Sequence, residues 1–237
     1  MLGVSLIGRT GELASLRAAW SRQGGQPRVA LVTGGPGTGK SALVAAVAAG
    51  VPAERVLAGR ARVHSPAPYD WLAGVLCGGD LDALPAPREA VAWLAQRPEA
   101  PAQRYAPGSL LRLAVQVVRH LVAGRPALLV VEDLHALDPA SLNLVAELAH
   151  TPHLPALLLV TSRPTTDPLA ALTRARLAGA PHAERLHLGG LPESAVRELV
   201  AATVPGADPG LAADLYRRSG GNPYALTELL ARAAALV

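Results

Sequence analysis

Three runs of consecutive apolar residues divide the chain. They cover residues 29–32, 127–131 and 156–160. Because no polar residue alternates with the apolar ones, each run is typical of a strand covered on both faces, as in a parallel sheet. Two less apolar segments, residues 55–60 and 185–188, predict additional strands.

Between and after these strands, apolar residues recur three or four positions apart, which is the period of a helix face. Thr10 is the predicted N-cap of the first helix, and Asp138 followed by Pro139 predicts the start of another. Residues 64–108 contain scattered Pro and Gly and predict an irregular, partly helical insertion. The other helices are predicted at residues 42–49, 71–76, 88–94, 110–121, 139–148, 168–177, 193–202, 211–218 and 224–235.

The alternation of strands and helices predicts an α/β fold, in which a parallel sheet carries helices on both faces. In such a sheet, ligands bind outside the carboxyl ends of the strands. Four chemically distinctive segments fall at strand ends or helix breaks, namely residues 34–41, 132–133, 161–163 and 222–223. The binding site is therefore expected at this edge of the sheet.

The clearest motif follows the first apolar run. Residues 34–41 read GGPGTGKS, the P-loop pattern G-x-x-x-x-G-K-[ST], placed between a predicted strand and a predicted helix. Glycines allow successive backbone N–H groups to turn inward around an anion. Lys40 would add positive charge beside the β- and γ-phosphates, and Ser41 would offer a hydroxyl to Mg²⁺. The positive end of the helix that begins at Ala42 points at the same phosphates.

Lys40 is the only lysine among 22 basic residues, so a compact ammonium stands where a planar guanidinium would fit poorly. The alternative is a Gly-rich turn without a ligand. The nucleotide-binding residues predicted from this motif are Gly35, Pro36, Gly37, Thr38, Gly39, Lys40, Ser41 and Ala42.

Two acids follow the strand predicted at residues 127–131. From their order after the strand, we assign Glu132 to the magnesium shell, and Asp133 to the base that orients and deprotonates the attacking water. The alternative is that one of them is a solvated acid at a strand end. Arg163 follows the next apolar run and is predicted to reach the γ-phosphate, the alternative being an ordinary surface arginine. His135 is more typical of a structural hydrogen-bonding residue than of a catalyst.

Composition narrows the class of protein. Half of the 237 residues are apolar and none is Phe, so aliphatic side chains and Ala must fill the core. The net charge is +4 without any basic run or basic–aromatic cluster, so direct nucleic-acid binding by this segment is not expected. Cys77 is the only cysteine, which excludes an internal disulfide. Without a signal peptide or an apolar run of 18 residues, a cytoplasmic location with no membrane contact is expected.

In their order along the chain, these motifs resemble the signal transduction ATPases with numerous domains (the STAND class), which are related to AAA+ and NB-ARC ATPases. Within this class, the chain looks like the N-terminal ATPase module of large ATP-binding LuxR-type transcriptional regulators. The resemblance covers nearly the whole chain, and the ordered set is far more specific than a P-loop alone. It rests on Ile7-Gly8-Arg9 with Glu12-Leu13, on Gly34 to Ser41, on Leu128 to His135, on Thr161-Ser162-Arg163 and on Gly221-Asn222-Pro223.

The resemblance implies a P-loop NTPase core, a three-layer αβα sandwich around a mainly parallel five-stranded sheet. This core would cover residues 1–190, and a small C-terminal helical lid would cover residues 191–237. The resemblance also implies where the adenine lies. Backbone near Ile7, Gly8 and Arg9 would flank it, and Pro223 would close over it from the lid.

The resemblance further implies a switch with slow Mg²⁺-dependent ATP hydrolysis, in which ADP holds an inactive form and ATP favours oligomerisation and activation. A γ-phosphate that Arg163 and Lys40 contact binds one domain arrangement better than the other, and only such differential binding shifts populations. The switch would control a multidomain LuxR-type regulator. Its C-terminal sensor and DNA-binding domains are absent here, so we expect the chain to be a fragment of a longer protein.

Two positions depart from the family pattern. The acid pair is Glu-Asp where Asp-Asp or Asp-Glu is usual, so Glu132 is expected to alter the metal geometry or slow hydrolysis. Tyr224 stands where AAA+ motors often place an arginine. The alternative functions are a motor-type AAA+ ATPase acting as an oligomeric remodeller or loader, a small-molecule phosphotransferase, and a scaffold with a relic P-loop.

Overall fold

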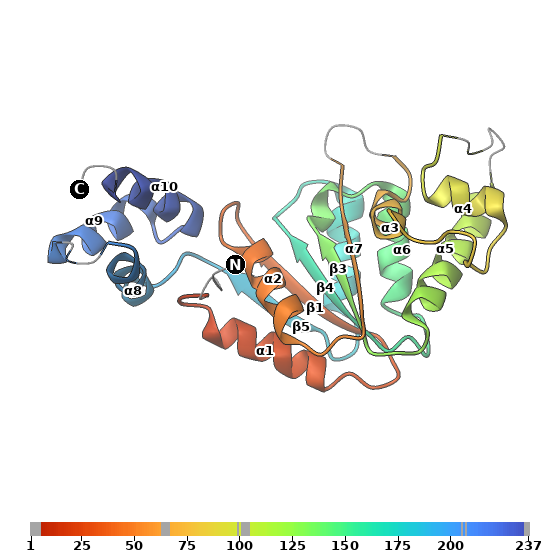
Figure 1. The fold of residues 1–237 in the computed structure, drawn as a ribbon, viewed down its shortest axis with the longest axis horizontal. Coiled ribbons are helices and arrows are strands. Elements are labelled where there is room, and N and C mark those ends of the chain that lie inside the picture. The colour runs from red at the N-terminus through yellow and green to blue at the C-terminus, as the bar shows by residue number, and fades with distance from the viewer. Residues whose placement is uncertain are drawn as a thin grey trace.

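The computed structural model describes residues 6–62, 67–98, 100, 105–204, 206 and 208–234. A single five-stranded sheet lies at the centre of the fold (Figure 1). Its strands follow the order β2-β3-β4-β1-β5, and all four pairings are parallel. The α/β class and the five-stranded sheet are therefore confirmed. The strands are β1 (Arg28–Gly34), β2 (Arg55–Arg60), β3 (Ala127–Glu132), β4 (Ala156–Ser162) and β5 (Glu184–Leu188).

Helices occur where the apolar spacing predicts them, with ends that match or are shifted by at most three residues. Residue 235, at the end of the last predicted helix, lies outside the described residues. The helices are α1 (Thr10–Ser21), α2 (Lys40–Gly50), α3 (Asp70–Leu76), α4 (Arg88–Leu94), α5 (Pro107–Val122), η1 (Leu134–Ala136, a 3₁₀ turn), α6 (Pro139–Leu148), α7 (Pro168–Ala178), α8 (Glu193–Thr203), α9 (Pro209–Ser219) and α10 (Pro223–Ala234).

The apolar runs are unbroken because the sheet is covered on both faces. In β3, Leu128 and Val130 belong to a core shared with α1 and α2. Leu129 and Val131 belong to a second core shared with α3 to α7. Successive side chains of a strand point to opposite faces, so every apolar position of this strand is buried in one core or the other.

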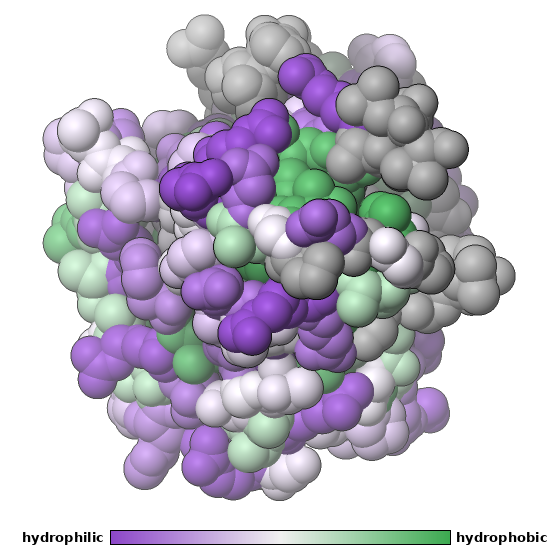
Figure 2. Space-filling model, turned by 90° about the vertical axis from the view of Figure 1, so that its left-hand side faces the viewer, coloured by the Kyte–Doolittle hydropathy of each residue, from purple (hydrophilic) through white to green (hydrophobic). Residues whose placement is uncertain are grey.

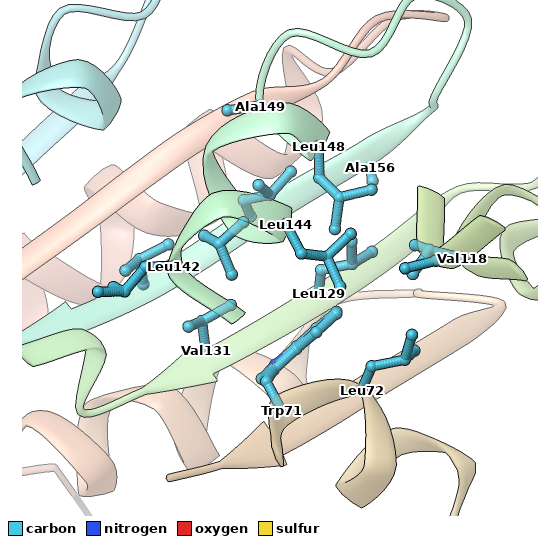
Figure 3. Packing of buried hydrophobic residues seen from close by; sticks show 14 of the residues in the cluster. Trp71, Leu72, Val118, Leu129, Val131, Leu142, Leu144, Leu148, Ala149 and Ala156 are labelled. Atoms are coloured by element: carbon cyan, nitrogen blue, oxygen red, sulfur yellow. The ribbon is translucent and has the colours of Figure 1, made fainter. Parts of the chain in front are cut away.

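The insertion between β2 and α5 contributes the largest fully buried side chain, Trp71 (Figure 3). Its indole Nε1 donates a hydrogen bond to the Val130 carbonyl at 2.8 Å. The Asp138 carboxylate accepts from the backbone N–H groups of Tyr69, Asp70 and Ser141 at 3.0, 3.1 and 2.9 Å. One carboxylate therefore caps α6, as predicted, and also fixes the start of α3.

The three C-terminal helices stand together to one side of the sheet (Figure 1, blue). They bury a third apolar cluster of their own, which runs from Leu191 to Leu230. The face on this side of the molecule is mainly hydrophilic, interrupted by smaller apolar areas (Figure 2). No helix of the described residues is long and apolar enough to cross a membrane.

One local prediction is wrong. Thr10 is the first residue of α1 rather than its N-cap, and the N-cap position is Arg9. The Arg9 carbonyl accepts the first helical hydrogen bond from Leu13 at 3.0 Å. The helix starts one residue early because the Arg9 side chain is itself fixed, donating to Glu12 at 2.8 Å within the first turn.

Candidate functional site

The P-loop connects β1 to α2 at the carboxyl edge of the sheet. Gly37 and Gly39 have φ angles of 72° and 90°, a left-handed region in which a side chain is strained. The buried Lys40 folds back over the loop. Its Nζ donates to the carbonyls of Gly34 and Gly35 at 2.9 and 2.7 Å. The loop thus holds a single ammonium at the N-terminal end of α2, which is the arrangement needed to bind phosphate.

Ser41 and Glu132 meet although 91 residues separate them in the sequence. The Ser41 hydroxyl donates to Glu132 Oε2 at 2.5 Å. The other carboxylate oxygen, Oε1, accepts a hydrogen bond from Arg60 Nε at 3.0 Å and forms an ion pair with Arg60 Nη2 at 2.8 Å. Arg60 reaches it because the last residue of β2 is paired in register with Glu132. The structure therefore brings together the two residues predicted to hold magnesium.

These two groups fit a magnesium ion. Mg²⁺ is usually held by one or two protein oxygens, with phosphate oxygens and waters completing the shell. Ser41 and Glu132 would supply that protein share and leave the remaining positions to a nucleotide. No cluster of three or more His, Cys, Asp or Glu residues suited to a metal is found within the described residues. A magnesium ion at this edge would therefore depend on the phosphates.

Asp133 lies beyond the end of β3 in a left-handed conformation, with φ of 52°. Its backbone N–H donates to Thr161 Oγ1 at 3.0 Å. Thr161 belongs to the neighbouring strand β4, so this bond fixes the turn in which Asp133 sits. Asp tolerates this conformation better than most residues, and such strained positions concentrate at functional sites.

His135 lies between Asp133 and Arg163, the predicted γ-phosphate sensor. Its Nδ1 accepts a hydrogen bond from the backbone N–H of Arg163 at 3.3 Å, and lies 3.9 Å from Asp133 Oδ1. Because Nδ1 accepts, the neutral ring carries its proton on Nε2. Burial lowers the pKa of His135. Asp133 opposes that shift, while Arg163 and Lys40 add to it.

The same charges act on the P-loop lysine. Burial is the main cause that lowers the pKa of Lys40, and the nearby positive charge of Arg163 lowers it further. The carboxylate of Asp133 acts in the opposite direction. A bound polyphosphate would supply the negative charge that two adjacent cations lack, so the electrostatics favour an anionic ligand between them.

These residues surround a cavity of about 310 Å³. The core supplies P-loop and strand-end residues, and the C-terminal helices supply three residues from the start of α10. The lining residues are Gly37, Thr38, Gly39, Lys40, Ser41, Ala42, Asp133, Arg163, Pro223, Tyr224 and Thr227. Gly35 and Pro36 do not line the cavity, but their carbonyls bind Lys40 and Asn222 respectively.

Two of the larger cavities, of about 500 and 540 Å³, lie away from the P-loop. The first is at Arg28, where β1 begins, and therefore at the opposite edge of the sheet. Neither contains residues of the predicted site. We place the candidate site in the smaller cavity because it is lined by the P-loop, Asp133 and Arg163, although it is not the largest.

The segment predicted to flank the adenine lies between the P-loop and the start of the C-terminal helices. The Arg9 guanidinium is buried and donates to the carbonyls of Gly189 and, at 3.4 Å, Thr38. A Cβ added to Gly8 would come within 2.5 Å of Ala195 Cβ in α8. Ile7 packs against the apolar cluster of the C-terminal helices. An adenine contact by these three residues stays a prediction.

Three residues that hold the site in place were not predicted from the sequence. Arg60 ends a predicted strand, but only the pairing of β2 with β3 places it on Glu132. Thr161 and Asn222 stand in motifs that the sequence did reveal, beside the residues chosen from them. Their roles depend on partners 28 and 186 residues away.

One protein family model matches a large part of the chain. The family model described as AAA ATPase domain matches residues 5–160, which include the P-loop and both acids. No curated protein sequence matches the chain.

Several solved structures share the fold. A STAND protein with a tetratricopeptide repeat sensor from Pyrococcus horikoshii is 17% identical, with a TM-score of 0.57 over 93% of this chain and 29% of its own. The Orc1 protein of Aeropyrum pernix in complex with DNA is 17% identical, with a TM-score of 0.58 over 95% of this chain and 59% of its own. The Drosophila ORC bound to DNA is 21% identical, with a TM-score of 0.57 over 97% of this chain and 57% of its own. The chain thus spans less than two thirds of each of these proteins.

Proposed function

Because the chain belongs to the AAA ATPase domain family, we propose that it binds ADP and ATP with Mg²⁺, hydrolyses ATP slowly and acts as a nucleotide-dependent switch. One observation carries this proposal. Lys40 of the P-loop, the acid Asp133 and Arg163 from the next strand face one cavity, which residues of the C-terminal helices complete. The STAND-class resemblance found in the sequence agrees with the family and with the fold.

Each side chain has a defined part in this proposal. Lys40 exchanges its main-chain partners for the β- and γ-phosphate oxygens, and the amides of residues 37–42 surround the phosphates. Ser41 and Glu132 would hold magnesium, which would neutralise charge on the phosphates. Asp133 orients the attacking water and accepts its proton. Arg163 contacts the γ-phosphate and so distinguishes ATP from ADP.

Slow hydrolysis follows from the small number of cations near the transferred phosphoryl group. Among the residues that line the cavity, Lys40 and Arg163 are the only cations, and Tyr224 occupies the lid position. Rapid phosphoryl transfer commonly requires an additional arginine that stabilises charge in the transition state. Both cations belong to the core, so the γ-phosphate would be sensed there rather than by the lid.

We further propose that residues 1–190 form the nucleotide-binding core and residues 191–237 the lid. In a longer parent chain, C-terminal sensor and DNA-binding domains of a LuxR-type transcriptional regulator would follow, in the cytoplasm. ATP binding would then favour a homo-oligomer. The ordered sequence motifs support this more specific function, since they extend beyond the family pattern itself.

The second candidate function is a motor-type AAA+ ATPase that acts as an oligomeric remodeller or loader. The fold shared with Orc proteins is compatible with it. Tyr224 argues against it, because a motor of this kind commonly carries an arginine at the lid position.

The nucleotide carried by the purified protein provides the first test. We expect denaturation to release ADP in a ratio near one per chain, and titration of the stripped protein to restore it only with Mg²⁺ present. A protein that releases no nucleotide and gives no binding heat with either ADP or ATP would contradict the proposed function.

A further inference from the structure

The turn that begins α10 is fastened directly to the P-loop. Asn222 Nδ2 donates a hydrogen bond to the Pro36 carbonyl at 3.0 Å. Two residues later, the backbone N–H of Tyr224 lies 3.2 Å from the Gly37 carbonyl and donates to it. The segments joined in this way lie 186 residues apart in the sequence. The loop that would bind phosphate and the helix that closes the cavity are therefore bonded to one another.

The other half of the same amide caps the lid helix. Asn222 Oδ1 accepts from the backbone N–H groups of Tyr224 and Ala225 at 3.0 and 3.3 Å, so the Tyr224 N–H is shared between this oxygen and the Gly37 carbonyl. Only an amide serves both purposes here, because capping requires an acceptor and the Pro36 carbonyl requires a donor. Aspartate caps a helix without having a donor, and the hydroxyl of serine is too short to reach the loop.

The surfaces around this bond are in close contact. A Cβ added to Gly37 would lie 2.7 Å from Asn222 Oδ1 and 2.8 Å from Tyr224 Cβ. The same turn also packs on the segment that follows β5, where the Leu191 N–H donates to the Gly221 carbonyl at 2.7 Å. A Cβ on Gly221 would lie 2.2 Å from the Leu191 carbonyl. The turn therefore touches both the P-loop and the connection between core and lid.

From this geometry we infer that Asn222 is a positioning residue that couples the P-loop to the lid. It places Pro223 and Tyr224 over the cavity and ties the lid to the loop whose amides surround the phosphates. This inference rests on the proposed nucleotide site and adds a route by which binding reaches the lid. Coupling is reciprocal, so lid docking tightens nucleotide binding by the same factor by which nucleotide stabilises lid docking.

The test variant is Asn222→Ser, which keeps a neutral capping group and removes the donor to Pro36. Its matched control is Asp208→Ser, because the Asp208 carboxylate caps α9 in the same group of helices, accepting from Gly210 at 2.6 Å, and is exposed. We expect Asn222→Ser to weaken Mg²⁺–ADP binding about five- to tenfold, as the loss of one hydrogen bond allows. The control should remain within about twofold of the parent. Titration calorimetry measures both.

Hydrogen exchange distinguishes coupling from a merely structural role. Without nucleotide, residues 35–39 and 222–227 should exchange faster in Asn222→Ser than in the parent. At saturating ADP, the P-loop of both proteins should become protected, but only the parent should gain additional protection in α10. If Asn222→Ser does not fold, Asn222→Asp serves instead, since its carboxylate caps α10 and has no N–H for Pro36.

Equal ADP-induced protection of α10 in parent and variant would overturn the inference. An ADP affinity unchanged by the substitution would do the same. A parent that binds no ADP would instead refute the proposed function. The nucleotide-free exchange rates would then decide whether Asn222 holds the P-loop, and identical rates in parent and variant would refute that as well.

Discussion

The two parts of the chain that we propose as core and lid contribute different chemistry to one cavity. Every charged side chain that lines it, namely Lys40, Asp133 and Arg163, comes from the core. The lid contributes Pro223, Tyr224 and Thr227, which are neutral. We therefore expect that charged residues of the core sense the number of phosphates on the bound nucleotide. The lid would respond through its position, which depends on neutral hydrogen bonds and close packing.

Removing the P-loop ammonium should produce the largest effect. We expect Lys40→Ala to weaken Mg²⁺–ADP binding by about 100-fold or more, beyond calorimetric detection, because a charged contact to phosphate is lost. Arg55→Ala is the matched control, since Arg55 is an exposed cation at the far end of β2. An unchanged ADP affinity in Lys40→Ala would contradict the proposal that charged residues of the core recognise the phosphates.

The acid should affect the rate rather than binding. Asp133→Asn is expected to retain ATP and to hydrolyse it about 100-fold more slowly, the usual contribution of a positioned base. Single-turnover measurements with pre-bound ATP isolate the chemical step. Asp82→Asn, which alters an exposed acid paired with Arg88 at 3.3 Å, should leave that rate unchanged. Equal rates for parent and Asp133→Asn would refute the assignment of the base.

Arg163 should discriminate between nucleotides. In Arg163→Ala we expect ATP affinity to fall about tenfold while ADP affinity stays within about twofold, because only ATP has the γ-phosphate. Competition titrations of the two nucleotides measure this ratio. Arg176→Ala, which removes an exposed arginine on α7, is the control. Equal weakening of ATP and ADP binding would mean that Arg163 does not sense the γ-phosphate.

A positive charge introduced into the lid would test whether the lid can also sense the γ-phosphate. Tyr224 is 68% exposed at the cavity, and its backbone contact to Gly37 does not depend on the side chain. Tyr224→Arg should raise ATP affinity about threefold relative to ADP, as expected for one exposed charge. Tyr224→Leu controls for loss of the ring. No change with arginine would indicate that the lid position does not face the γ-phosphate.

The smallest expected effect is on the pH dependence of stability. Burial holds the pKa of His135 below 6.5, so the unfolded chain takes up this proton more readily. This contribution to stability is complete above pH 6.5 and is lost as the pH falls below it. In α9, hydrogen bonds from Arg217 and, second, from Arg218 lower the pKa of the exposed Asp214. The contribution of Asp214 to the pH dependence of stability therefore falls below pH 3.8. Between pH 7.5 and 5, denaturation midpoints should therefore fall less in His135→Asn than in the parent. Equal falls would contradict this account.

Much of the core could be predicted from local patterns. The apolar runs identify β1, β3 and β4 because a strand buried on both faces shows no alternation. The P-loop is recognisable because its glycines and lysine lie within eight residues. The start of α1 was misplaced by one residue, because Arg9 takes the N-cap position and its side chain is held by Glu12 in the first turn and by Gly189 far away in the sequence.

The sequence by itself determined the strands, most of the helices and the phosphate loop, because each depends on residues close together along the chain. Only the tertiary structure decided which strands are neighbours, and hence that Arg60 holds Glu132 and that Thr161 fixes Asp133. It also decided that Asn222 joins the lid to the P-loop. Such contacts depend on packing between distant segments, and the spacing of residues within one segment carries no information about its partner.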